Sequence, residues 1–112
     1  MKLPNAESAV IDLEKLRAYS LNPNHPEGKH KARVFQSRLG FIADDAERLR
    51  EMVLSAVLTT DTIEGAVDKY GSRYVVDFPV QGLHGMVMIR TAWIIDAGET
   101  IPRLVSCYVK RK

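Results

Sequence analysis

The side chains of this sequence that could carry out chemistry are basic, hydroxyl-bearing or aromatic, and they fall into two stretches. The first stretch is His30-Lys31-Ala32-Arg33, near the start of an expected helix. The second stretch is the C-terminal half, whose strand-like segments contain Arg73, Arg90, Thr91, Trp93, Arg103, Ser106 and Tyr108. If the two stretches meet in space, they form a cationic site with one titratable imidazole.

Metal-free cleavage of RNA is a reaction that uses these residue types. It needs a base for the ribose 2′-hydroxyl, an acid for the leaving 5′-oxygen, and cations for the charge that develops on phosphorus. Histidine titrates near neutral pH, arginine is planar and always charged, and aromatic rings can stack on exposed bases. The set that would suffice, if its members converge, is His30, Lys31, Arg73, Arg90, Thr91 and Tyr108.

Each of these candidates also has a structural interpretation, which the sequence leaves open. His30, at a helix start, can be a surface or capping residue. The strand arginines can cover a solvated sheet face with their stems, or pair with Asp77, Asp96 and Glu99. Thr91 is an ordinary strand residue by propensity.

The strong motifs of other enzyme classes are missing from the sequence. It contains no glycine-rich phosphate loop with lysine, no GxSxG and no HExxH. The three histidines, His25, His30 and His84, do not have the spacing of helical metal ligands. We therefore expect neither a metal site nor another cofactor.

Length and composition predict one globular domain over residues 1–112. Hydrophobic residues are 46% and charged residues 27% of the chain, which is typical of ordinary folded domains. The single cysteine, Cys107, is compatible with a reducing compartment. No apolar run approaches the roughly 20 residues of a membrane helix, and the N-terminus lacks a signal-peptide core. These features predict a cytoplasmic protein without membrane association.

Net charge gives weaker information about partners. A net charge of +2 does not by itself indicate nucleic acid. The basic cluster Lys110-Arg111-Lys112 can be a solvated tail or a phosphate contact.

The first half of the chain reads as an irregular lead-in over 1–11 and a helical part over 12–58. Asp12 is a good cap for a short helix, and the loop with Pro23 and Pro26 must follow it. Pro26 or Glu27 can open a second helix, which we expect to stop at Gly40. A third helix begins at Asp44 or Asp45 and has the strongest helical periodicity, through Leu49, Val53 and Val57.

The second half, over 63–110, reads as strands with short connections. The expected strands are 63–69, 73–78, 86–95 and 103–109, with a hairpin turn at 82–85. Pro79 indicates a strand end or an edge position. Alternation predicts that Val105, Cys107 and Val109 face the core, and that the strand 86–95 is covered on both faces. The fold class is therefore α+β, with two or three N-terminal helices packed on a three- to four-stranded antiparallel meander sheet.

Four blocks of residues are distinctive in combination, and they are His30-Lys31-Ala32-Arg33-Val34-Phe35, Tyr70-Gly71-Ser72-Arg73-Tyr74, Arg90-Thr91-Ala92-Trp93-Ile94-Ile95 and Pro102-Arg103-Leu104-Val105. With these blocks, nearly the whole chain resembles a family of small bacterial proteins known only as a domain of unknown function. The layout is also similar to C-terminal toxin domains of bacterial polymorphic and contact-dependent systems. Those domains are assigned to the barnase–EndoU–colicin–RelE class of metal-independent ribonucleases.

This second resemblance implies a helical part on a four-stranded sheet and specific roles for several residues. His30 is the implied acid or base, Arg90 and Thr91 are phosphate or transition-state contacts, and Tyr108 is a further catalytic-site residue. The remaining cations are expected to bind substrate, and they are Lys31, Arg33, Arg73 and Arg103.

Two functions are carried forward from the sequence. The first is a ribonuclease-type toxin of a toxin–antitoxin or polymorphic toxin system, which acts on RNA and has a cognate small protein partner. The alternative is a non-catalytic interaction protein of the same fold, which binds a small protein partner through an exposed sheet edge or its basic face. The sequence leaves the oligomeric state open.

Overall fold

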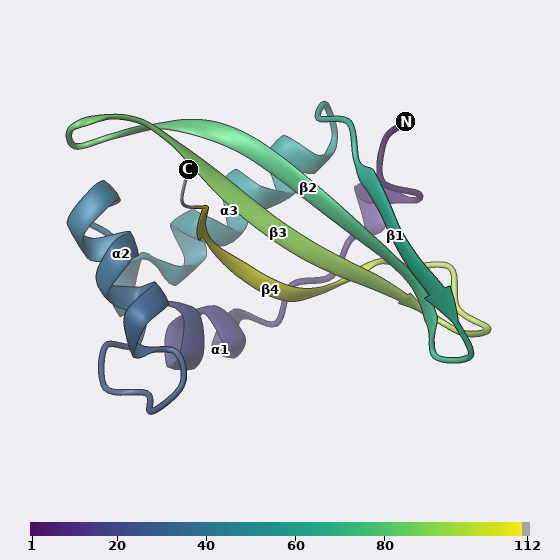
Figure 1. Cartoon of the computed structure of the whole chain (residues 1–112), viewed down its shortest axis with the longest axis horizontal. Coiled ribbons are helices and arrows are strands. Elements are labelled where there is room, and N and C mark those ends of the chain that lie inside the picture. Colours follow the sequence, from purple (N-terminus) through teal and green to yellow (C-terminus); the bar gives the residue numbers. More distant parts are fainter. Residues whose placement is uncertain (111–112) are drawn as a thin grey trace.

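A computed structural model describes residues 1–110, so Arg111 and Lys112 of the C-terminal basic cluster lie outside the described residues. The helical elements come first along the chain and the strands follow (Figure 1). The helical elements are η1 (Ala6–Ser8), α1 (Leu13–Lys15), η2 (Leu16–Ser20), α2 (Lys29–Leu39), η3 (Ala43–Asp45) and α3 (Ala46–Val57). The strands are β1 (Ile63–Asp68), β2 (Gly71–Gly82), β3 (Gly85–Asp96) and β4 (Arg103–Lys110).

The four strands form one antiparallel sheet in the order β1-β2-β3-β4. Each strand pairs with the next one along the chain, which is the meander that short connections predict. The α+β fold class is confirmed, with three α-helices and four strands among residues 1–110. No helix among residues 1–110 is both long and apolar enough to cross a membrane.

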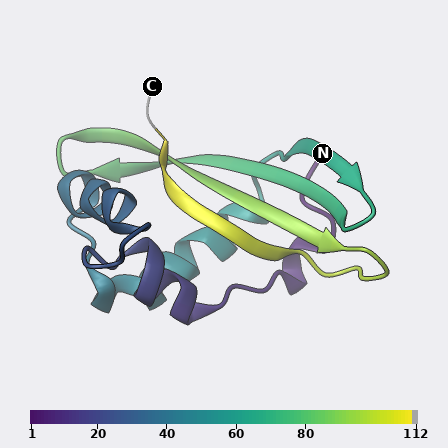
Figure 2. The same ribbon diagram turned by 60° about the horizontal axis from the view of Figure 1, so that its bottom comes forward.

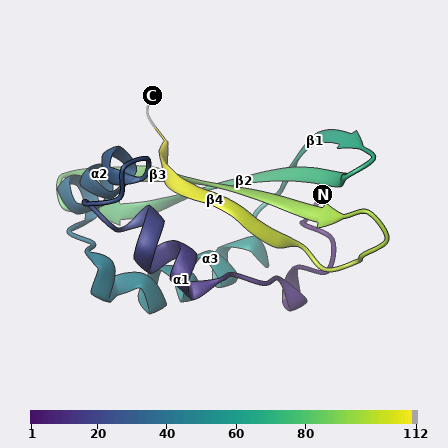
Figure 3. The same cartoon turned by 90° about the horizontal axis from the view of Figure 1, so that it is seen from below.

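The sheet has one covered face and one open face. Seen edge-on, α1 and α3 lie on one side of the sheet, and α2 lies beside β4 (Figures 2 and 3). A single apolar cluster joins both layers and includes Phe35, Leu49, Ile89 and Trp93. The prediction that both faces of the third strand are covered is wrong, because Met86 and Met88 on the open face are 60% and 38% exposed.

The loop before α2 shows why this helix begins later than predicted. The ring Nδ1 of His25 accepts hydrogen bonds from the backbone N–H groups of Glu27 and Gly28, at 3.1 and 3.0 Å. These bonds hold residues 26–28 in a turn, and α2 begins at Lys29 rather than at Pro26 or Glu27. The expected end of the helix is confirmed, since Gly40 takes the left-handed conformation with φ 73°.

Two features of the sheet differ from simple alternation. Pro79 does not end β2 but lies within it. Only the segment 71–75 of β2 pairs with β1, so at Pro79 the side of β2 that faces away from β3 is unpaired, and the expected edge position is confirmed. In β4, a register shift beside Ala92 and Trp93 leaves Val105 without a facing residue. The prediction that Val105 faces the core is therefore wrong: it is 43% exposed, and Leu104 is buried instead.

We expect Gly28→Ala to destabilise the fold, because η2 passes directly over this position. A Cβ atom at Gly28 would lie 2.4 Å from the carbonyl oxygen of Tyr19. The substitution should lower the free energy of unfolding by about 1–3 kcal/mol, as overpacking usually does. Urea denaturation measures the change, with Ser37→Ala on the exposed side of α2 as the control. Equal midpoints for Gly28→Ala and wild type would show that η2 does not contact this turn.

Candidate functional site

Three strands align a set of polar side chains on the open face of the sheet. The register places Asp77 of β2 opposite Arg90 of β3, and Arg90 opposite Tyr108 of β4. Lys110 lies two residues beyond Tyr108 and therefore on the same face. Cross-strand neighbours on one face are within contact distance, so the four side chains form one polar cluster.

An ionised carboxylate holds this cluster together. Arg90 donates from Nε and Nη2 to the two carboxylate oxygens of Asp77, each at 2.8 Å, and Lys110 Nζ lies 3.3 Å from Oδ2. The hydrogen bond from Arg90 and the one from Lys110 hold the pKa of Asp77 below its usual value, although partial burial opposes them. In the same way, the hydrogen bond to Asp77 raises the pKa of Arg90, and Tyr108 adds to this effect. Asp77 is therefore charged at neutral pH and fixes the direction of the Arg90 guanidinium.

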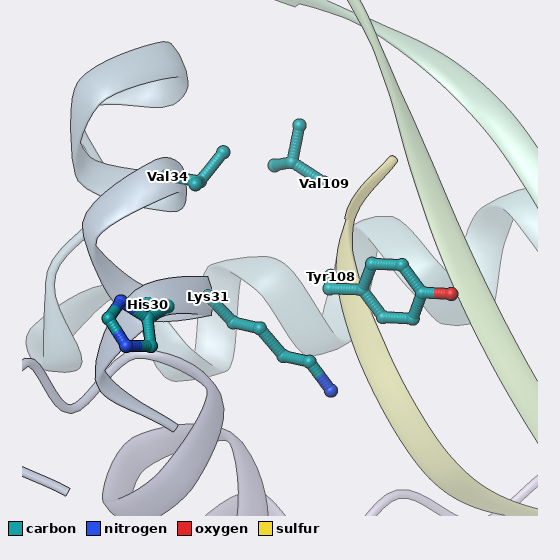
Figure 4. A pocket seen from close by; sticks show the side chains of 5 residues that line it. All are labelled: His30, Lys31, Val34, Tyr108 and Val109. Carbon is teal, nitrogen blue, oxygen red and sulfur yellow. The ribbon is translucent and has the colours of Figure 1, made fainter. Parts of the chain in front are cut away.

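Beside this cluster, α2 and β4 enclose a cavity of about 340 Å³. It is lined by His30, Lys31, Val34, Tyr108 and Val109 (Figure 4). The Lys31 side chain extends from α2 toward β4, and its Nζ lies 4.9 Å from the centre of the Tyr108 ring. The exposed His30 ring lies on the α2 side of the cavity, and the Tyr108 hydroxyl points away from it. Lys31 thus connects the cavity to the cluster on the open face.

Four of the predicted site residues are brought into one region. His30, Lys31 and Tyr108 line the same cavity, and Arg90 is the cross-strand neighbour of Tyr108. Arg33 lines an adjacent hollow on the other side of Val34. The region is cationic and contains an imidazole, a phenol and a carboxylate, which are groups that can act as acids, bases or anion contacts.

Three other predicted residues lie elsewhere. Thr91 is fully buried, where its hydroxyl donates to Val76 O and accepts from Trp93 Nε1, both at 2.8 Å, so its predicted contact with phosphate does not fit this position. Arg73 pairs with Asp68 at 2.9 Å, and Arg103 pairs with Asp96 at 3.2 Å. Arg73 lies four residues before Asp77 on β2, and Arg103 faces Ile94, which lies four residues after Arg90 on β3. Both arginines are therefore at the opposite end of the sheet from α2.

From the sequence, Asp77 is only a possible ion-pair partner of the strand arginines and Lys110 only part of a basic cluster, although a signal that pairs Asp77 with Arg90 is present. Counting five residues back from Gly82 and five forward from Gly85 places Asp77 opposite Arg90. The length of the two-residue turn therefore predicts the pairing of Asp77 with Arg90. Lys110 could not be assigned in this way, because the bulge in β4 shifts the register in a manner that the sequence does not reveal.

The fold and this polar site define a small α+β protein with a cationic junction between one helix and an edge strand. Residues 2–111 match the family described as Domain of unknown function (DUF6883), and the chain belongs to this family. The expected membership in an uncharacterised family is thus confirmed, whereas the resemblance to ribonucleases stays a prediction. A search of curated proteins and a search of solved structures each returned no match.

The lowered pKa of Asp77 predicts a pH-dependent contribution to stability. Because the folded state holds the carboxylate in its charged form, the stabilisation is present above the usual pKa of about 4 and is lost as pH falls below it. Asp77→Asn should therefore be less stable than wild type by about 1–3 kcal/mol at pH 7, and the difference should shrink toward pH 3.

Thermal or urea unfolding between pH 7 and pH 3 measures this difference. Asp44→Asn is the matched control, since Asp44 is exposed and makes no ion pair with any residue from 1 to 110. A difference between Asp77→Asn and wild type that stays constant over this range would contradict the ion pair.

Proposed function

We propose that this protein is a metal-independent endoribonuclease that acts as a bacterial toxin in the cytoplasm, where its RNA substrate is found. One observation carries the proposal: His30, Lys31 and Tyr108 line a common cavity, and Arg90 lies next to Tyr108 on the neighbouring strand. These four residues come from α2, β3 and β4, and three of them were predicted as catalytic from their chemistry and from the resemblance.

In the proposed reaction, a base removes the proton of a ribose 2′-hydroxyl and O2′ attacks the adjacent phosphorus. The bond between phosphorus and O5′ then breaks, and O5′ receives a proton. His30 carries out one of these two proton transfers, because histidine is the side chain that most often acts as a general acid or base in enzymes. Lys31 and Arg90 stabilise the negative charge on the non-bridging oxygens, and Asp77 keeps the Arg90 guanidinium in position.

The other predicted cations take different places in this proposal. Arg33 extends the positive surface along α2 and contacts the RNA backbone outside the reacting phosphate. Arg73 and Arg103 are held by Asp68 and Asp96 and have structural roles, and Thr91 stabilises the core.

The ribonuclease proposal predicts growth arrest and RNA fragmentation when the protein is expressed in a bacterial host. His30→Ala should relieve both effects, since losing an acid–base residue reduces the rate by about 10²–10⁴-fold. His84→Ala is the matched control, because it removes another exposed imidazole from the hairpin turn, outside the residues that line the cavity. Intact RNA and normal growth with abundant soluble wild-type protein would contradict the proposal.

A second prediction separates the arginines. Arg90→Ala should reduce cleavage of a synthetic RNA by about tenfold or more, because it removes charge stabilisation of the transition state. Arg103→Ala also breaks an arginine–aspartate pair, but a more exposed one at the other end of the sheet, and should cleave like wild type. The measurement is the initial cleavage rate of purified proteins whose folding is checked by circular dichroism. Equal losses in the two variants would place the chemistry away from Arg90.

The second candidate function is a non-catalytic protein that binds a small protein partner. Two observations favour it: the Tyr108 hydroxyl points away from His30, and a basic hollow with exposed methionines lies directly beside the cavity. Intact RNA in the expression experiment would make this second function the one to pursue.

A further inference from the structure

A groove runs between the outer side of α2 and the end of the β2–β3 hairpin. Its volume is about 970 Å³. Its apolar lining includes Val34 of α2, Pro79 of β2, and Met86 and Met88 of β3. Pro79 and both methionines are exposed, so the groove presents uncovered apolar surface to solvent. Contiguous exposed apolar surface on a small protein commonly marks an interaction site.

The charges around this groove all have the same sign. Arg33 and Arg38 extend from α2, and Lys110 extends from the end of β4. Within residues 1–110, neither Arg33 nor Arg38 forms an ion pair, whereas Lys110 is paired with Asp77. The sequence of α2, Lys-His-Lys-Ala-Arg-Val-Phe-Gln-Ser-Arg-Leu, contains no acidic residue that could neutralise these arginines. The ligand that complements the groove therefore carries negative charge next to apolar groups.

The lining residues favour a polypeptide over a nucleic acid. Single-stranded RNA is held by stacking of bases on aromatic side chains, and none of the residues that line this groove is aromatic. Methionine side chains are flexible and polarizable, and they adapt well to the apolar side chains of a peptide. Addition of an extended strand to β2 is disfavoured, because Pro79 in the unpaired segment of this edge has no N–H to donate. A helix whose side chains fill the groove meets these constraints.

We infer that this groove docks an acidic amphipathic helix of a small partner protein. Val34 and Val109 line both the groove and the His30–Tyr108 cavity, so a helix seated in the groove lies directly beside that cavity. The proposed docking rests on the groove alone and does not depend on the ribonuclease function. Inhibition by the docked helix rests on the proposed ribonuclease function.

The experiment is a display selection of random 16-residue peptides on the full-length wild-type protein, followed by fluorescence anisotropy with the enriched peptides. The expected peptides are rich in Asp and Glu and have apolar residues at helical spacing. Met88→Glu places a negative charge in the lining of the groove and should weaken their binding at least tenfold. Ile63→Glu makes the same change at an exposed position on β1, 57% accessible, and should bind like wild type.

The outcomes separate docking from catalysis. No enrichment, enrichment of basic peptides, or equal binding to Met88→Glu and wild type would overturn the docking site. Tight binding of a single-stranded RNA oligonucleotide that Met88→Glu abolishes, together with no enrichment of any peptide, would assign the groove to RNA and also overturn it. Selective peptide binding without any RNA cleavage by wild type would support docking and reject the ribonuclease, whereas cleavage that an enriched peptide inhibits would support both.

Discussion

The register of the β2–β3 hairpin determines where the charged side chains of the candidate site lie. Twelve consecutive residue pairs join the two strands without a shift, from Gly71–Asp96 to Gly82–Gly85. A slip by one residue would move every side chain of a strand to the other face. Asp77 would then enter the core while Arg90 kept its place, or the reverse, and the cationic cluster would not form. The site thus depends on a backbone pairing rather than on the affinity of its charges for one another.

Buried polar bonds and glycine geometry together hold this register. Thr91 donates to Val76 O across the two strands and accepts from Trp93 Nε1, so a slip would leave polar groups unsatisfied in the core. At the turn, Gly85 has φ 129°, which residues with a side chain rarely adopt. At the far end, a Cβ on Gly71 would lie 2.2 Å from the carbonyl oxygen of Ile95. Thr91 therefore serves the site by fixing the strands that present Arg90, although its own hydroxyl is inaccessible.

Local sequence rules predicted the elements well, and they predicted single contacts where a tight turn carries the information. The helix stop at Gly40, the hairpin at 82–85 and the edge position of Pro79 each follow from one residue's backbone preference. The bulge at Val105 and the late start of α2 do not follow from a local backbone preference. The bulge involves a partner distant in sequence, and the helix start depends on a side chain in an unusual role. Lys15 Nζ donates to the carbonyl of Val105, and His25 holds the turn before Lys29.

The cavity that His30 and Tyr108 share is the part of the site that the sequence could not predict. The two residues line one cavity because α2 packs beside β4, an arrangement set by the shared core around Phe35 and Cys107 rather than by either segment alone. The positive charges on the two sides of this packing contact differ in whether a carboxylate neutralises them. On the sheet, Arg90 and Lys110 share the carboxylate of Asp77, whereas α2 contains cations and no acid. Most of the uncompensated charge of this region therefore lies along one helix, between the cavity and the methionine-lined groove. The positive charge of α2 attracts anionic groups, whether on a phosphate or on a carboxylate-rich helix. Val34 and Val109 line both the cavity and the groove, so the two candidate sites for such groups adjoin.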